Sequence, residues 1–185
     1  MGKEKVISVY IRPESVEGDP YVRIPETIDK DPATKRPDRE TGKIITLWEE
    51  KLKYPYKTKV SYEVNITTNK YFYRMNILLT DGEYIYNGSN IPSMFWSLLG
   101  ISKDSPEGLM ASLVHDNFLQ YKEHFLEVAR TFNPSLTVSE FRALTTEIYE
   151  QLVINYGVKK NKAKVMGFFI NVWQILFNPD WRKLV

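Results

Sequence analysis

The chain has 185 residues, which is enough for one domain, or for one domain with an extended arm. It has no cysteine, and this excludes disulfide bonds, thiolate zinc sites and cysteine nucleophiles. Its 25 Lys and Arg against 23 Asp and Glu give a net charge of only +2, which is no broad basic footprint for nucleic acid. No stretch approaches the roughly 20 apolar residues of a membrane span. The longest, "VMGFFINVWQILF" (165–177), predicts a buried helix.

The N-terminal segment has two parts. "VISVYI" (6–11) alternates weakly and predicts a strand, whereas residues 12–42 hold five of the ten prolines, with charged residues between them. Proline removes a donor from a strand ladder and holds its predecessor extended, so we expect no regular element there. We therefore divide the chain into an N-terminal strand with a proline-rich extended arm (1–43) and a single α+β domain (44–185). The arm is either a free linker or, in the interpretation that we favour, a segment that orders in an assembly.

Three strand patterns follow the arm. "YKTKVSYEVNI" (56–66) places apolar residues at every second position, and "YFYRMNILL" (71–79) comes after a short polar break. "TDGEYIYNG" (80–88) contains Asp81-Gly82, a pair that is typical of a two-residue hairpin turn. These patterns predict a small three-stranded antiparallel meander.

The rest of the chain is helical in pattern. We expect helices over 91–100, 105–121, 137–157 and 161–177, each bounded by proline, glycine or a capping residue. The third of them has Thr137 at capping-box spacing before its first turn and a glycine at its end. Its apolar face is formed by Phe141, Leu144, Ile148, Leu152 and Tyr156. Strands followed by helices predict an α+β fold, with a helical half after the meander.

The stretch "SLVHDNF" (112–118) holds one of only two histidines. On a helical wheel, His115 shares a face with small residues, so it projects into a tight junction or a shallow pocket. Asp116 points about 100° away, so the two side chains cannot form a bidentate clamp and need a third group. The pair is either a polar clasp between packed helices or part of a catalytic or metal site.

A turn and a single glutamate are the other candidate site residues. "YNGSNIP" (86–92) is a glycine-bearing turn before a helix, which either orients a side chain or anion through backbone N–H groups or simply connects strand to helix. We expect this turn to face His115, and its residues are Asn87, Gly88, Ser89 and Asn90. Glu147 lies away from the apolar face of its helix, as a solvated glutamate does.

Three stretches together resemble a known family. They are "NGSNIPSMFW" (87–96), "ASLVHDNFL" (111–119) and "TEIYEQLVINYGV" (146–158). In their order they resemble the phage and prophage proteins grouped as domain-of-unknown-function family 1353, over about residues 60–175. The resemblance implies a virus context, because members occur near genes for tail or virion parts, and it implies no reaction.

The chain departs from the pattern of that family at four positions. Asn87 stands where the family has an aspartate, Asn90 where it has a serine, and Leu119 where it has a tyrosine. Glu147 replaces an aspartate. The asparagines remove charge and hydroxyl groups from the turn, which favours a structural role over a catalytic one.

We therefore expect a bacteriophage virion-associated structural protein, such as a connector, ring or tail component. Its partners are other virion proteins in a symmetric assembly, its location is the virion and, during assembly, the host cytoplasm, and it needs no membrane or cofactor. In this interpretation the protein is no enzyme, and His115 and Asp116 form the clasp. Aromatic residues, 14% of the chain, supply the interfaces.

The alternative is a metal-dependent hydrolase. In this hypothesis His115 is the general base, Asp116 binds calcium or zinc, and Glu147 either orients His115 or binds the metal, in a layout similar to that of secreted phospholipases. The missing disulfides and the two asparagines count against it. A nucleic-acid module is not expected either, because Lys59, Lys70 and Arg74 form no dense basic stripe.

Overall fold

The structure is a computed structural model. It describes residues 3–13, 22–23, 35–37, 43–46, 56–86 and 106–177. The strands are β1 (Val6–Pro13), β2 (Val22–Arg23), β3 (Lys35–Pro37), β4 (Ile44–Thr46), β5 (Tyr56–Thr58), β6 (Tyr62–Thr68), β7 (Phe72–Asn76) and β8 (Tyr84–Tyr86). The helices are α3 (Pro106–Gln120), α4 (Lys122–Phe132), α5 (Val138–Asn155) and α6 (Lys160–Phe177). The predicted α+β fold is confirmed.

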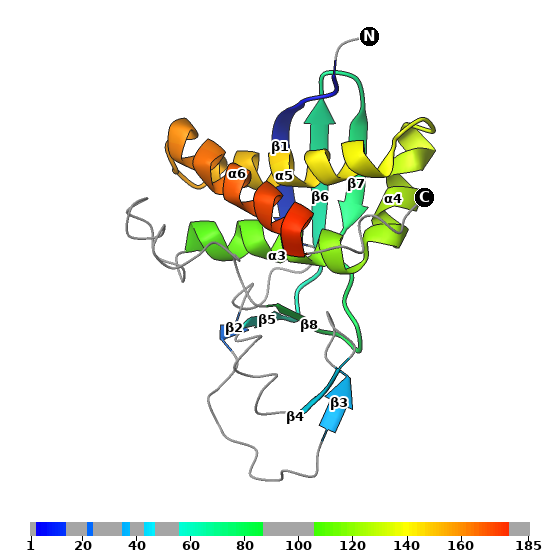
Figure 1. Cartoon of the computed structure of the whole chain (residues 1–185), viewed down its shortest axis with the longest axis vertical. Coiled ribbons are helices and arrows are strands. Elements are labelled where there is room, and N and C mark those ends of the chain that lie inside the picture. The colour runs from blue at the N-terminus through cyan, green and yellow to red at the C-terminus, as the bar shows by residue number, and fades with distance from the viewer. Residues whose placement is uncertain are drawn as a thin grey trace.

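The main sheet is antiparallel and has the order β1-β6-β7 (Figure 1). Tyr10 of β1 lies opposite Asn65 of β6, and Asn65 lies opposite Arg74 of β7. Every second residue of β6 is buried, as one packed and one open face require. The N-terminal strand therefore belongs to the same sheet as strands that follow the division predicted at residue 43.

The meander was predicted correctly for two strands and wrongly for the third. The hairpin of β6 and β7 is present, but β8 pairs with β5 in a second sheet of order β2-β5-β8. The tight turn itself is there, with φ of 54° at Asp81 and 78° at Gly82. The chain leaves the β-ladder of the main sheet before this turn. The backbone N–H of Leu78 donates to Oδ1 of Asn117 at 3.0 Å, and its C=O accepts from Nδ2 of Asn117 at 2.9 Å, so neither group pairs with a strand.

The proline-rich segment is less irregular than predicted. Residues 12–42 contain two short strands, Val22–Arg23 pairing with β5 and Lys35–Pro37 pairing with β4, so the expectation of no regular element is wrong there. Pro37 is the last residue of its strand, a position where a missing N–H donor costs little.

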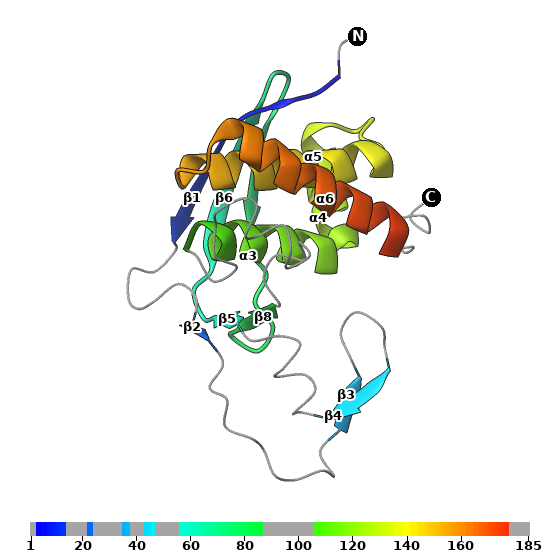
Figure 2. The same ribbon diagram turned by 60° about the vertical axis from the view of Figure 1, so that its left-hand side comes forward.

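The helices pack on one face of the main sheet. Helix α5 contacts β1, α4 contacts β7, and α6 lies against the side of α5 away from the sheet (Figures 1 and 2). Helix α3 contacts α5 and β8, and it is buried on almost every side. Among the largest fully buried side chains are Tyr73, Tyr84, Tyr86, Phe118, Phe125, Phe141 and Tyr149.

Helix α5 matches its prediction closely. Thr137 caps it, and the capping box with Glu140 is complete in both directions. Gly157 follows its end with φ of 99°. Four of the five predicted face residues are buried, but Tyr156 is exposed because it lies at the C-cap, beyond the sheet.

The other helical predictions had mixed outcomes. Helices α3 and α6 lie where we expected them, whereas α4 was not predicted, and the expected helix at 91–100 lies outside the described residues. The expected buried helix at 165–177 is wrong as to burial, since α6 packs on α5 with one face only. Among the helices that the structure describes, none combines the length and the apolar character needed to cross a membrane.

Candidate functional site

Helix α3 places His115 in a closed junction between helices. The small residues on its face, Ala111 and Ser112, are fully buried, so neighbouring helices approach closely and His115 is only 7% exposed. Asp116 is half-buried beside it. The prediction of a tight junction is confirmed for His115.

Three groups contact the His115 ring. Its Nε2 lies 2.6 Å from Nε2 of Gln174 on α6, its Nδ1 lies 3.4 Å from Oδ1 of Asp116, and its ring meets Tyr149 of α5 edge-on at 5.6 Å. The amide nitrogen of Gln174 donates this hydrogen bond and the imidazole Nε2 accepts it. Gln174 is the third group that the pair needs.

Sequence reasoning missed Gln174. It lies 59 residues from His115, and it is buried in α6 among apolar residues. The sequence indicated only that Gln174 is a polar residue within the apolar run at 165–177. A buried polar side chain needs a hydrogen-bond partner, but the sequence does not specify which residue that partner is.

Glu147 does not join this cluster. Its Oε2 accepts a hydrogen bond from the backbone N–H of Val6 at 2.9 Å, and its Oε1 lies 3.8 Å from Nζ of Lys3. Two residues along a helix correspond to a rotation of about 200°, so Glu147 and Tyr149 lie on nearly opposite sides of α5. Tyr149 is the residue that faces His115. Within the described part of the chain, no three His, Asp or Glu side chains are grouped to hold a metal ion. The predicted turn residues, Asn87, Gly88, Ser89 and Asn90, lie outside the described residues.

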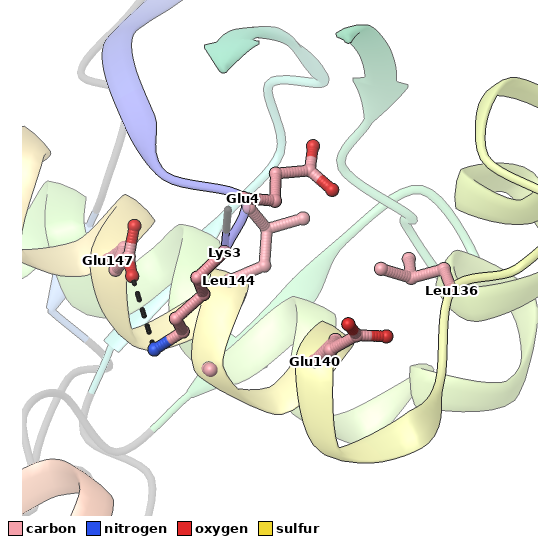
Figure 3. A pocket seen from close by; sticks show the side chains of 7 residues that line it. Lys3, Glu4, Leu136, Glu140, Leu144 and Glu147 are labelled. Atoms are coloured by element: carbon pink, nitrogen blue, oxygen red, sulfur yellow. Dashed lines mark ion pairs between the residues drawn. The ribbon is translucent and has the colours of Figure 1, made fainter. Parts of the chain in front are cut away.

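Glu147 borders a shallow hollow between α5 and the N-terminal residues (Figure 3). Its empty volume is about 270 Å³, open solvent at its mouth included. It is lined by Lys3, Glu4, Leu136, Glu140, Ala143, Leu144 and Glu147. Glu140 already forms the capping box with Thr137, and Glu147 accepts a hydrogen bond from the backbone N–H of Val6. The side chains that line the hollow therefore form a seam, a line of contacts that joins β1 to α5.

Glu4 also lines this hollow, and its carboxylate joins the N-terminal residues to β6, β7 and the end of α4. Its Oε1 accepts hydrogen bonds from Oγ1 of Thr68 at 2.7 Å and from the hydroxyl of Tyr73 at 2.8 Å. Its Oε2 accepts from the amide of Asn133 at 3.2 Å. Burial, followed by the hydrogen bond to Glu4, raises the pKa of Tyr73 above its ordinary value, so the phenol remains a donor. These partners lie 64 to 129 residues away, and no local pattern pointed to them.

A half-buried carboxyl, that of Glu150, lies between α5 and α6. A Cβ added at Gly167 would lie 2.5 Å from Cγ and 2.6 Å from Cδ of Glu150, so this side chain rests directly on Gly167. Burial, and then the charge of Glu147, raise the pKa of Glu150 from 4.5 to about 7, against the opposing effect of Lys164 and Lys3.

The Glu150→Gln variant should therefore be more stable than the wild type only at high pH. The folded state favours the protonated carboxyl, so its stabilising contribution is complete below pH 4.5 and is lost as pH rises through about 7. After screening by solvent, we expect the variant to gain about 1 to 2 kcal/mol at pH 8 and nothing at pH 4.5. Urea unfolding at both pH values measures this, and an equal difference at the two would contradict it.

Comparison with known proteins finds no similar chain: no family model, curated protein or solved structure matches.

Proposed function

We propose that this protein is a structural, virion-associated component that acts through protein–protein interfaces. One observation carries the proposal: α6 leaves an apolar face open to solvent. The setting, a bacteriophage particle with a symmetric arrangement of virion proteins, is supported by the resemblance of "NGSNIPSMFW" and "ASLVHDNFL" to the phage family. The protein would be in the host cytoplasm during assembly and in the virion afterwards.

The exposed face of α6 is contiguous. Its residues recur at three, four and seven positions, which places them on one side of the helix. Val165, Phe168, Ile175 and Leu176 are exposed, and Val172 between them is half-buried. Phe168 is 62% exposed and Leu176 63%. The opposite side, with Ala163, Met166 and Ile170, packs in the core.

Such a face is unfavourable in water. Each square ångström of apolar surface removed from water contributes about 25 cal/mol, and contiguous exposed apolar patches mark binding surfaces. Scattered apolar residues need no explanation, but four of the large exposed ones lie on this single helix. A partner that covers α6 would bury them together.

The geometry at His115 supports the same conclusion. A general base needs to reach a substrate proton, whereas this ring is buried and Gln174 occupies its Nε2. The cluster ties α3, α5 and α6 together, as a clasp does. It thereby holds α6 in the orientation that presents its apolar face.

Substituting Phe168 by glutamate should remove the protein from the particle. We expect a fixed copy number per wild-type particle, and at least a tenfold lower number for Phe168→Glu, because a charge would have to be buried at the interface. Quantitative mass spectrometry of purified particles measures both numbers. Tyr10→Ala, an exposed aromatic on the main sheet, is the matched control and should leave the copy number unchanged.

Two results would contradict the proposal. Absence of the wild-type protein from particles would refute the virion assignment and direct attention to hydrolase assays on His115 and Asp116. A fixed copy number that Phe168→Glu leaves unchanged would refute the role of the α6 face.

A further inference from the structure

The face of the main sheet that points away from the helices is open. Side chains of three strands line up across it in rows that the register defines. One row holds Ser8, Thr67 and Phe72, the next Tyr10, Asn65 and Arg74, and the third Arg12, Glu63 and Asn76. Their neighbours along the strands, such as Val9, Val64 and Tyr73, are buried on the helix side.

Two aromatic rings stand on this face. Tyr10 is 66% exposed and Phe72 46%, and they lie on the two edge strands, one row apart. Two strand spacings and two residues of rise put them roughly 12 Å apart. That separation leaves each ring free to receive a flat ligand of its own.

One cation lies near Phe72, and others lie at one end of the sheet. The guanidinium carbon of Arg74 lies 6.0 Å from the centre of Phe72, and its Nε contacts Asn65 at 3.3 Å and Glu63 at 3.6 Å. The hydrogen bond from Asn69 to the carbonyl of Lys5 brings Lys5 to the end of the sheet where Lys70 lies.

The charge of this face is therefore positive. Arg12, Arg74, Lys5 and Lys70 are exposed, and among the row residues Glu63 is the acidic one. Within the rows, Arg12 and Arg74 less Glu63 leave a charge of +1, and Lys5 and Lys70 are exposed at one end of the sheet.

We propose that the open face of the main sheet binds single-stranded nucleic acid. Bases stack on Tyr10 and Phe72, and backbone phosphates pair with the arginines and with the lysines at the end of the sheet. The flat faces of unpaired bases are free to stack on aromatic rings, whereas in a duplex the bases are already stacked on one another. A protein partner would instead need an interface centre poor in charge, which the Arg74–Glu63 pair in the middle of the face does not provide.

Fluorescence anisotropy with the full-length protein tests this proposal. The probes are labelled oligo-dT and oligo-U of about 12 nucleotides, which cover a typical site size. We expect binding at about 50 mM salt, with log K falling at a slope of about −3 against log salt for four phosphate contacts. Tyr10→Ala and Phe72→Ala should each weaken binding about tenfold through lost stacking.

The control is Tyr156→Ala, an exposed aromatic at the C-cap of α5, which should bind as the wild type does. No binding at low salt would overturn the proposal, and so would equal binding by a Tyr10→Ala/Phe72→Ala double variant whose thermal midpoint is unchanged. Equal affinity for a duplex of the same length would also overturn it. None of these outcomes depends on copy number in particles, so this proposal and the proposed function fail separately.

Discussion

Replacing His115 by alanine should lower the free energy of unfolding by about 2 to 3 kcal/mol. The ring is buried, so its removal leaves a cavity beside Tyr149. It also leaves the buried amide of Gln174 without its 2.6 Å partner, and an unpaired buried donor retains its full desolvation cost. Urea unfolding monitored by tryptophan fluorescence and circular dichroism measures the loss.

His124→Ala provides the matched control, because His124 is the other histidine and is exposed on α4. We expect a change within about 0.5 kcal/mol there. The double variant His115→Leu/Gln174→Leu should recover most of the lost stability, since replacing both partners by apolar groups leaves no orphaned donor. A fully stable His115→Ala protein would contradict the clasp and favour the hydrolase alternative.

Glu4→Ala is expected to release the N-terminal strand. Its carboxylate is the shared acceptor for Thr68, Tyr73 and Asn133, and both the Tyr73 ring and Asn133 are buried. Hydrogen bonds to a charged group are worth about 1.5 to 3 kcal/mol, so we expect a total loss of about 2 to 4 kcal/mol. Amide hydrogen exchange should rise in β1 before it rises in α5, because β1 is an edge strand.

Glu127→Ala is a suitable control, since Glu127 is exposed on α4. We expect it to leave both the unfolding midpoint and the exchange of β1 unchanged. Glu4→Ala with wild-type protection of β1 would show that the three hydrogen bonds of Glu4 are not needed to hold this strand.

Features that depend on neighbouring residues were predictable. The capping box of Thr137 and Glu140 acts over three residues, and the turn at Asp81-Gly82 requires only its own positive φ angles. The positions of α5 and α6 follow from such signals and from apolar periodicity. The small residues on the same face of α3 predicted a tight junction or a shallow pocket at His115, and the structure has the junction.

Features that depend on distant partners were not predictable. A turn does not specify which strand its flanking residues pair with. Here the backbone N–H and C=O of Leu78 bond to the side-chain amide of Asn117, which lies 39 residues away on α3. Beyond the turn, β8 pairs with β5 and not with β7. The same limit applies to Glu147, whose contact with Val6 spans 141 residues, so its bond to β1 and its separation from His115 had no sequence signal.

The sequence by itself determined the α+β class and the ends of α5, because periodicity, capping and turn chemistry act within a few residues of the chain. Only the tertiary structure decided that Gln174 closes the site at His115, that Glu4 and Glu147 fasten β1, and that α6 keeps an apolar face in solvent. An apolar run shows that a helix has surface to bury. How much of that surface the fold covers depends on the helices and strands that pack against it.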